Sequence, residues 1–493
     1  MNAPNPPTLR TLNSQPPPGV ELLHLTDTRT RRVEKIEPST PGRLSIYACG
    51  PTVYRFAHVG NLRTFLLSDL IRRVATLQGL QVTVVQNITD VGHMADDRGL
   101  DEAGEDKILS QAKQENRSAL DVARFYEDAY LADLSRLNIA PADIAPRASE
   151  SIDLMIELIQ KLIDNDNAYV GGDGSVYFDA RSIDNYGAIS GNKLDALRPG
   201  TRFAIEEDPE ASGRKRFHAD WALWKVAGDT RTQLVWDTPW GVGFPGWHVE
   251  CSAMSVHHLG DTIDVHTGGI DLRFPHHEDE KAQSDAAVGK EVVRHWVHAE
   301  HLLFDGRKMA KSTGNVLLLQ DVIDRGIDPL ALRLCFLEHN YRQQMNLTWN
   351  AIESAATTLT RWRTKIAQWA EEPSAPMHEP TRVAVVDAFN EDLDTPRAIQ
   401  ALRRLEKDDS VEAGARFETF NYLDRLLGLD LVREVGKPVV AQELPAGAQS
   451  LLDARAQART DKDWAASDSL RDELASLGVL VADSKDGQSW SLA

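Results

Sequence analysis

A strand–helix–strand pattern near the start of the chain constrains its fold more than any other feature. Residues 44–50, LSIYACG, read as a short buried strand ended by a glycine. Residues 61–79 carry apolar side chains at helical spacing, with Gly79 as a stop signal, and residues 81–89 form a second β-rich run. Strands joined in this way by a helix run parallel, so the sequence predicts an α/β fold with a Rossmann-like parallel sheet.

The segment between the first strand and the helix, residues 51–60, is a candidate ligand-binding loop. Its sequence is PTVYRFAHVG. In open parallel sheets, ligands bind beyond the carboxyl ends of the strands, where the loops diverge. The sequence therefore predicts a binding site at this edge of the sheet.

The rest of the chain alternates between helical and mixed segments. Residues 107–164 have a helical pattern after an acidic insertion at 96–106, and residues 169–241 are turn-rich with a charged loop at 206–216. Strand-like signals return in VGFPGW and DTIDVHTGG, which indicates that the chain re-enters the α/β domain after an insertion. From about Asp328 the pattern is helical, and the final segment predicts two helices followed by a strand pair.

Composition excludes some classes of protein. The sequence has no apolar run of the ~18 residues that a membrane span needs, and its proline-rich start lacks a secretory signal, so we expect a cytoplasmic protein. The net charge of −20 argues mildly against a nucleic-acid partner, although a large acidic enzyme accommodates a local basic groove. Its three cysteines do not suggest a disulfide framework. Cys335 lies in an apolar helical pattern and is expected in the core.

A second group of residues has the chemistry of a metal site. His276 and Glu280 stand four residues apart, a spacing that places both on one face of a helix. Cys251 and Cys49 offer two thiolates, and two sulfurs with an imidazole and a carboxylate make a plausible tetrahedral zinc set. The alternative is a solvated helix face with cysteines in the core, because nothing local shows that the four side chains meet.

Two further segments have features of a nucleotide site. His58 and Asn61 open the predicted helix directly after a strand and a turn, where a helix N-terminus favours anions. Lys308 and Lys311 lie in KMAKSTGN, a cationic loop that would neutralise phosphate charge. The simpler interpretations are a turn with Asn61 as N-cap and an exposed basic turn.

Together these segments resemble a known family. YACGPTVYRFAHVGN resembles the HIGH signature of class I aminoacyl-tRNA synthetases, and KMAKS resembles their KMSKS signature. GFPGWHVECSAM and GGIDLRFPHHEDEKAQS look like the cysteine-specific family of that class. The terminal DKDWAASDSLRDELASLGVLVADS is similar to the tRNA-binding end of the family.

The resemblance implies an aminoacyl-tRNA ligase. Such an enzyme activates L-cysteine with ATP to cysteinyl-adenylate and pyrophosphate, and then transfers cysteine to the 3′-terminal ribose of tRNA(Cys). The family implies one Zn²⁺ per chain, Mg²⁺ with ATP, no membrane partner and a monomer.

The resemblance also implies roles for individual residues. The family's zinc ligands fall on Cys49, Cys251, His276 and Glu280. Its catalytic and ATP-binding residues fall on His58, Asn61, Lys308 and Lys311, and a tryptophan near the adenine falls on Trp247. Its residues near the amino acid fall on Gly50, Thr52 and His266. Ala310 replaces the middle serine of KMSKS, which removes one hydroxyl but neither lysine.

A division into domains follows from the same resemblance. The predicted parts are a disordered tail at 1–40, the first half of the catalytic domain at 41–165, a connective insertion at 166–235, the second half at 236–300, an ATP-loop junction at 301–348, a helical bundle at 349–440 and a small tRNA anticodon-region domain at 441–493.

Two alternatives remain at this stage. A paralogous ATP-dependent cysteine ligase of the mycothiol type resembles the catalytic core and acts on a small amine, but it lacks a tRNA-binding end. A non-enzymatic RNA-binding homologue is disfavoured by the intact His58, loop lysines and candidate ligands.

Overall fold

Two compact units make up the chain, Met1–Val435 and Gly436–Ala493. The computed structural model describes residues 23–91, 106–197, 214–228, 231–309, 315–437, 444–484 and 487–492. No helix in these ranges is long and apolar enough to cross a membrane.

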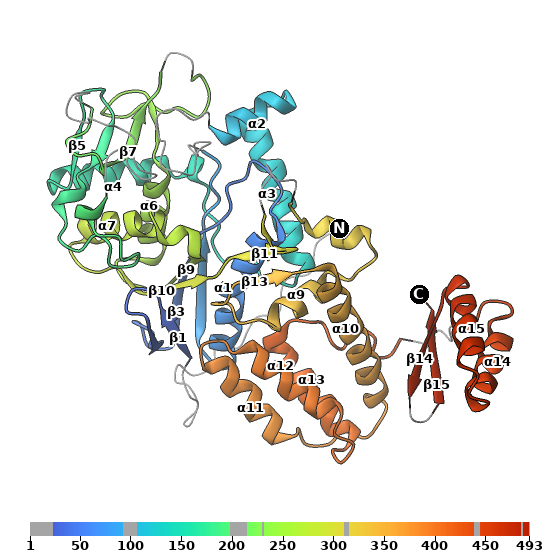
Figure 1. Ribbon diagram of the computed structural model, residues 1–493. Coiled ribbons are helices and arrows are strands. Elements are labelled where there is room, and N and C mark those ends of the chain that lie inside the picture. Colours follow the sequence, from blue (N-terminus) through green and yellow to red (C-terminus); the bar gives the residue numbers. More distant parts are fainter. Residues whose placement is uncertain are drawn as a thin grey trace, which may run out of the picture. The chain divides into compact units, whose positions relative to one another are not determined.

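A parallel four-stranded sheet organises the first unit (Figure 1). Its strand order is β10 (Val293–Ala299), β9 (Ile263–Gly269), β3 (Arg43–Ala48) and β4 (Gln81–Gln86), and every neighbouring pair is parallel. Helix α1 (Val59–Leu77) connects β3 to β4. All seven residues of β9 are buried, as expected for a central strand of a sheet covered on both faces. The predicted α/β fold with a strand–helix–strand unit is confirmed.

The other strands of this unit form three smaller sheets. An antiparallel sheet contains β5 (Ala168–Val170), β6 (Val176–Phe178), β7 (Trp221–Val226) and β8 (Gly243–Pro245). A second contains β12 (Arg307–Lys308), β11 (Leu302–Phe304) and β13 (Met345–Leu347), and a hairpin contains β1 (His24–Asp27) and β2 (Arg32–Lys35). The helices besides α1 are α2 (Lys107–Glu115), α3 (Ala119–Arg136), α4 (Ile152–Asp164), α6 (Trp247–Leu259), α7 (His276–Val288), α8 (Leu319–Asp324), α9 (Pro329–Leu337), α10 (Trp349–Trp369), α11 (Glu379–Asn390), α12 (Thr395–Glu406) and α13 (Ala413–Leu427).

The ordered chain begins earlier than predicted. The hairpin of β1 and β2 lies within the segment 1–40 that was expected to be a disordered tail, and Leu23 and Leu25 are buried. The amide of Thr28 donates to the carbonyl of Trp296 in β10 at 2.8 Å, which attaches the hairpin to the sheet edge. Strands this short carry little sequence signal because their stability comes from the sheet they join. Residues 1–22 lie outside the described part.

The helical pattern over 107–164 is interrupted twice. Asn116 ends α2 in the left-handed conformation, at φ 52°. Residues 137–151 then leave the helix, and Ile144 and Arg147 form bridges with Val85 and Ile88. Here backbone pairing with the sheet prevails over helix propensity. The acidic insertion at 96–106, apart from its last residue, lies outside the described residues.

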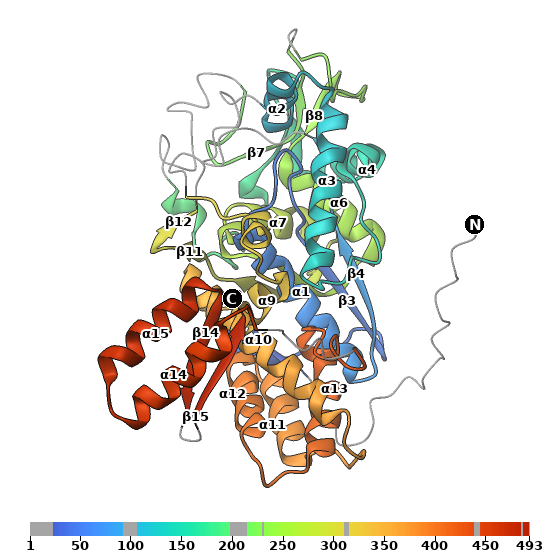
Figure 2. The same cartoon turned by 90° about the vertical axis from the view of Figure 1, so that its right-hand side faces the viewer.

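Helices α10 to α13 pack side by side as a bundle (Figures 1 and 2). Cys335 in α9 is fully buried in the main core, as predicted. A buried ion pair joins α9, which precedes the bundle, to α1.

Arg333 of α9 makes that ion pair with Asp69 of α1, and both side chains have 0% exposure. Its Nη2 donates to Asp69 Oδ2 at 2.7 Å, and its Nη1 donates to the carbonyls of Leu137 and Asn138 after α3. Its Nε donates to the carbonyl of Leu427 at the end of α13. A buried charge is tolerated only when it is paired and hydrogen-bonded, and this guanidinium is both.

The second unit is small and has its own core. It contains α14 (Ala448–Thr460), α15 (Trp464–Ser476), β14 (Val479–Ser484) and β15 (Gly487–Leu492). The core residues are Ala448, Leu452, Leu474 and Val479. Two helices followed by an antiparallel strand pair confirm the expectation for this segment.

Candidate active site and metal cluster

Loops after β3 and β4 approach each other at the carboxyl edge of the parallel sheet. The amide of Gly50 donates to Asn87 Oδ1 at 2.8 Å. A Cβ added at Gly50 would lie 1.7 Å from the Asn87 carbonyl oxygen, so only glycine permits this approach. Thr52 forms a backbone bridge with Thr89. Gly50 and Thr52 therefore lie at the edge where the sequence predicts a ligand.

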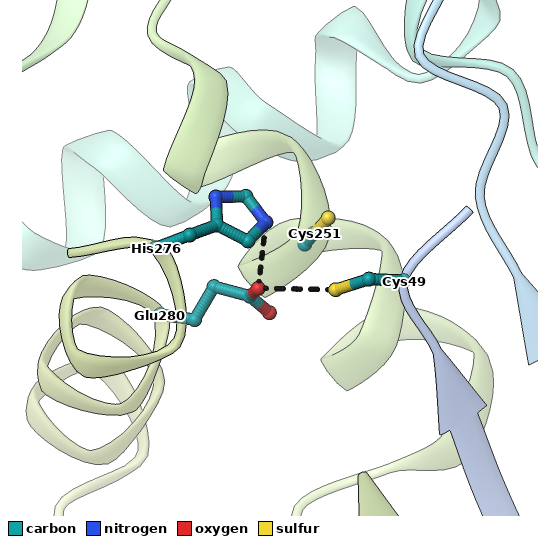
Figure 3. A group of neighbouring side chains, drawn as sticks. All are labelled: Cys49, Cys251, His276 and Glu280. Carbon is teal, nitrogen blue, oxygen red and sulfur yellow. Dashed lines mark hydrogen bonds and ion pairs between the residues drawn. The ribbon is translucent and has the colours of Figure 1, made fainter. Parts of the chain in front are cut away.

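The four predicted zinc ligands converge beside this edge (Figure 3). Cys49 follows β3, Cys251 lies in α6, and His276 and Glu280 lie in α7. Their ligand atoms all lie within 4.8 Å of one another, and all four residues are buried. Glu280 Oε1 accepts from the Cys49 thiol at 3.4 Å and lies 2.9 Å from His276 Nε2. The fold thus joins residues that are up to 231 positions apart.

The cluster holds several groups that are costly to bury in charged form. Burial raises the pKa of Cys49 well above its ordinary value and raises the pKa of Cys251 to about 11. Burial also raises the pKa of Glu280 to about 7. Glu280 Oε2 and His266 Nδ1 are buried and have no hydrogen-bond partner. Two sulfurs, an imidazole nitrogen and a carboxylate oxygen are ordinary zinc donors, so the residues fit a divalent metal ion.

A second layer of side chains orients His276. His248 Nδ1 lies 2.7 Å from His276 Nδ1, and His248 Nε2 lies 3.3 Å from Asp279 Oδ2. This contact occupies His276 Nδ1 and leaves Nε2 directed at Glu280. Outer partners of this kind fix the tautomer and ring orientation of metal-binding histidines.

An overlapping group of four also has metal-binding capacity: Cys49, His266, His277 and Glu280. His266 Nε2 and His277 Nε2 lie 3.4 and 3.2 Å from Cys49 Sγ. Burial lowers the pKa of His266 to about 4 and that of His277 well below its ordinary value, so both rings are neutral. The group that contains Cys251 has two sulfurs, which suits zinc better.

The two predicted nucleotide segments meet at the start of α1. His58 and Leu318 form a backbone bridge, and the amide of Val59 donates to the carbonyl of Leu317 at 3.0 Å. A Cβ at Gly60 would lie 2.9 Å from Met309 Cε. The segment that follows the KMAKS loop therefore runs beside the HVGN segment.

His58, rather than Asn61, is the N-cap of α1. The amide of Asn61 donates to His58 Nδ1 at 3.2 Å, and Asn61 Oδ1 accepts from the His58 amide at 3.1 Å. This reciprocal pair is a capping box. Burial lowers the pKa of His58 to about 4, with Arg55 and Lys308 adding to the effect. His58 is therefore neutral, with its proton on Nε2.

The remaining predicted residues are distributed as follows. Lys308 is exposed on β12, whereas Ala310 and Lys311 lie outside the described residues. Trp247 begins α6, and its ring stacks on His276 at 4.1 Å between centroids. This position is beside the metal cluster, and contact with adenine stays a prediction.

Sequence reasoning missed several residues of the site. His248, His277 and His298 form hydrogen-bond contacts around the cluster, and His277 Nδ1 lies 2.8 Å from His298 Nε2. Glu250 is fully buried, and its Oε2 accepts from Thr89 Oγ1 at 3.1 Å. Two signals in the sequence could have found them. His248 stands three residues before Cys251, and His298 lies near the end of a parallel strand.

Comparison with known proteins places this arrangement in a class. The LeuRS–tRNA–LeuAMS ternary complex of Agrobacterium radiobacter K84 has a similar fold, with a TM-score of 0.57 over 80% of this chain and 84% of that chain, at 10% identity. This likeness shows the fold, and a family model of a class I catalytic domain, which matches more than half of the chain, places it among the class I aminoacyl-tRNA synthetases.

Within that class, the chain belongs to the cysteine-specific family. It matches the tRNA synthetases class I (C) catalytic domain over residues 35–357 and the Cysteinyl-tRNA ligase anticodon binding domain over residues 441–490. The Cysteine–tRNA ligase of Thermus thermophilus is 41% identical over 95% of this chain and 99% of its own length. That of Deinococcus radiodurans is 39% identical over 97% of both.

Proposed function

We propose that this chain is a cysteine–tRNA ligase that activates L-cysteine with ATP and transfers it to tRNA(Cys). The observation that carries the proposal is the meeting of two thiols, an imidazole and a carboxylate at the sheet edge where α1 begins. The family supports the same activity through relatives that match nearly the whole chain.

One zinc ion per chain would be held by Cys49, Cys251, His276 and Glu280. Glu280 Oε2, which has no hydrogen-bond partner, and the buried thiols fit this role because a divalent cation offsets the cost of burying their charged forms. Zinc when bound distinguishes the soft sulfur of cysteine from the oxygen of serine, which shape alone separates by only ~1–3 kcal/mol. Gly50, Thr52 and His266 would line the pocket for the amino acid.

In the first step, the cysteine carboxylate attacks the α-phosphorus of ATP, and pyrophosphate leaves. The nucleophile is the substrate itself, so the protein has to align the groups and stabilise phosphate charge. Neutral His58 carries its proton on Nε2, because Nδ1 accepts from Asn61, and can donate to a phosphate oxygen. The first amides of α1 add partial positive charge.

Lysines and a metal ion complete the binding of ATP in this proposal. Lys308 is exposed next to the start of α1, where its ammonium group can reach phosphate. Lys311 would add a second positive charge, and Mg²⁺ bound with ATP would supply further charge to neutralise the phosphates. Trp247 would border the cysteine pocket and the adenine.

In the second step, the cysteinyl group passes to the 3′-terminal ribose of tRNA(Cys). The anticodon-binding match at residues 441–490 supports tRNA as the acceptor over a small amine, because a mycothiol-type ligase lacks such an end. We further propose that the protein acts as a monomer in the cytoplasm, with the domain division given from the sequence, except that the hairpin of β1 and β2 belongs to the first compact unit.

The test is cysteine-dependent ATP–pyrophosphate exchange followed by charging of tRNA(Cys). Purified protein should exchange pyrophosphate with cysteine but not with serine, and should contain about one zinc per chain. Exchange without charging would indicate the small-amine ligase. Failure of both reactions would refute the proposal.

A further inference from the structure

Two exposed aromatic rings lie close to the nucleotide-binding segment. Phe56 is 44% exposed and Phe125 is 45% exposed. Among described residues between 23 and 437, no other phenylalanine or tryptophan is classed as exposed. Isolated surface hydrophobics need no explanation, but a cluster of rings usually marks a binding surface.

These rings form a cluster with Tyr126, which we call the aromatic platform. Phe56 and Phe125 both pack edge-on against Tyr126 at 5.1 Å between centroids, and lie 6.0 Å from each other. Tyr126 is buried, and its hydroxyl donates to Glu115 Oε1 at 2.6 Å. The platform is therefore pre-organised, with its base fixed and its two outer rings open to solvent.

One cation lies against the platform, and two more lie against a neighbouring tyrosine. The Arg117 guanidinium lies 5.1 Å from the Phe125 ring, and its Nη2 donates to the carbonyl of Asp121 at 2.9 Å. Arg55 and Lys107 lie 5.0 and 5.7 Å from the ring of Tyr54, two residues before Phe56. Aromatic faces interleaved with positive charge are the usual means of holding single-stranded nucleic acid.

Arg117 also lines a large cationic groove between α2, α3 and the antiparallel sheet. The cavity has a volume of about 1390 Å³. Its basic residues are Lys113, Arg117, Arg214, Lys215, Lys225 and Arg231. Against these six basic residues the groove is lined by three acidic ones, Asp106, Asp121 and Asp173, in a chain of net charge −20; Arg231 pairs with Asp106, and Arg117 pairs with Glu115. The local reversal of charge favours a polyanion.

The position of the platform selects the ligand. Phe56 lies two residues before His58, in the loop that presents the nucleotide site. An RNA strand whose terminal ribose reached that site would bring its last nucleotides near this loop, and an unpaired base would have a face free to stack on a ring. A protein partner would gain little from two rings set among like charges.

We propose that the aromatic platform stacks an unpaired nucleotide near the 3′ end of the tRNA, while the cationic groove follows its phosphates. The inference rests on the proposed function, because it takes tRNA as the substrate. It adds Phe56, Phe125 and Arg117 as residues that position the acceptor and have no part in cysteine activation.

Steady-state charging tests the stacking. Phe125→Ala should raise KM for tRNA about tenfold, since one base–aromatic stack is lost, while ATP–pyrophosphate exchange stays at the wild-type rate and shows that the variant is folded. Phe125→Trp should restore KM, and Phe125→Leu should not. Leu131→Ala, at a residue of α3 that is 40% exposed, is the matched control and should charge normally.

Direct binding separates this inference from the proposed function. Wild-type protein should change the fluorescence of 2-aminopurine placed at an unpaired 3′ nucleotide of the tRNA, with neither cysteine nor ATP present, and Phe125→Ala should lose most of that change. Equal KM for Phe125→Ala and wild type, or full activity of Phe125→Leu, would overturn the stacking. Absence of cysteine-dependent exchange in the wild type would refute the proposed function, while the fluorescence would still report on the platform.

Discussion

The metal cluster and the nucleotide segment lie at the same sheet edge but are built in opposite ways. Cys49, Cys251, His276 and Glu280 are all buried and are surrounded by a second layer of histidines. His58 and Asn61 sit at the open end of a helix, with Lys308 exposed nearby. Selecting sulfur over oxygen needs a dry, fixed set of donors, whereas a triphosphate needs access and positive charge. A substitution in the cluster should therefore abolish activity, whereas a substitution in the nucleotide segment should lower activity only in part.

Cys251→Ser is the change that should separate the two regions most sharply. We expect loss of tightly bound zinc and a fall in cysteine-dependent exchange of at least about a hundredfold, on the order of 2.7 kcal/mol. The fold should persist because serine is close to cysteine in size. Cys335→Ala removes a buried thiol outside the cluster and should leave zinc content and exchange unchanged. Normal exchange by Cys251→Ser would remove the cluster from the mechanism.

His248→Gln tests whether the second layer matters as much as the ligands. Loss of the contact with His276 Nδ1 should weaken zinc affinity about 10–100-fold, as is typical for outer partners of metal-bound histidines. Competition with a chelator measures this affinity, and added zinc should restore exchange. An unchanged zinc affinity would show that His276 is oriented without His248.

Lys308→Ala and Lys311→Ala examine the exposed region. Each should lower kcat for exchange about tenfold, or on the order of 1.4 kcal/mol, because one positive charge near the phosphates is lost. Zinc content should stay at the wild-type value, since neither lysine is one of the four candidate ligands. If kcat did not change, the loop would have no role in adenylation.

Asn61→Ala should give the smallest effect. It removes one half of the capping box, which contributes about 1 kcal/mol at typical helix starts, and should raise KM for ATP about fivefold. Asn61→Gln keeps an amide oxygen at the third helical position and should behave as wild type. A fivefold effect in both variants would point to direct contact of Asn61 with ATP instead of a role in capping.

Much of the fold and the ligand set was predictable from the sequence. The parallel sheet was predicted from two β-rich runs, 44–50 and 81–89, and the helix between them. Strands buried on both faces are recognisable because they are continuously apolar. His276 and Glu280 were found because helical spacing is local. The proximity of Cys49 and Cys251 to this pair depends on the tertiary structure. It could be predicted from the sequence only through the family resemblance.

What the sequence left undetermined depends on contacts between distant segments. His248, His277 and His298 come from three elements, and no local pattern shows that their ring nitrogens meet. The hairpin of β1 and β2 is stabilised by β10, which lies more than 250 residues away. The same reason explains the break after Arg136, where Ile144 and Arg147 pair with Val85 and Ile88 in competition with a good helical pattern.

The buried Arg333 has a mechanical consequence for the start of α1. It clamps Asp69, about 16 Å along the helix from His58 at ~1.5 Å per residue. If α1 tilted by about 4° around Asp69, His58 would move by about 1 Å. A displacement of this size can slow a reaction about a hundredfold. The position of His58 at the N-terminus of α1 therefore depends on an arginine that holds the middle of the same helix.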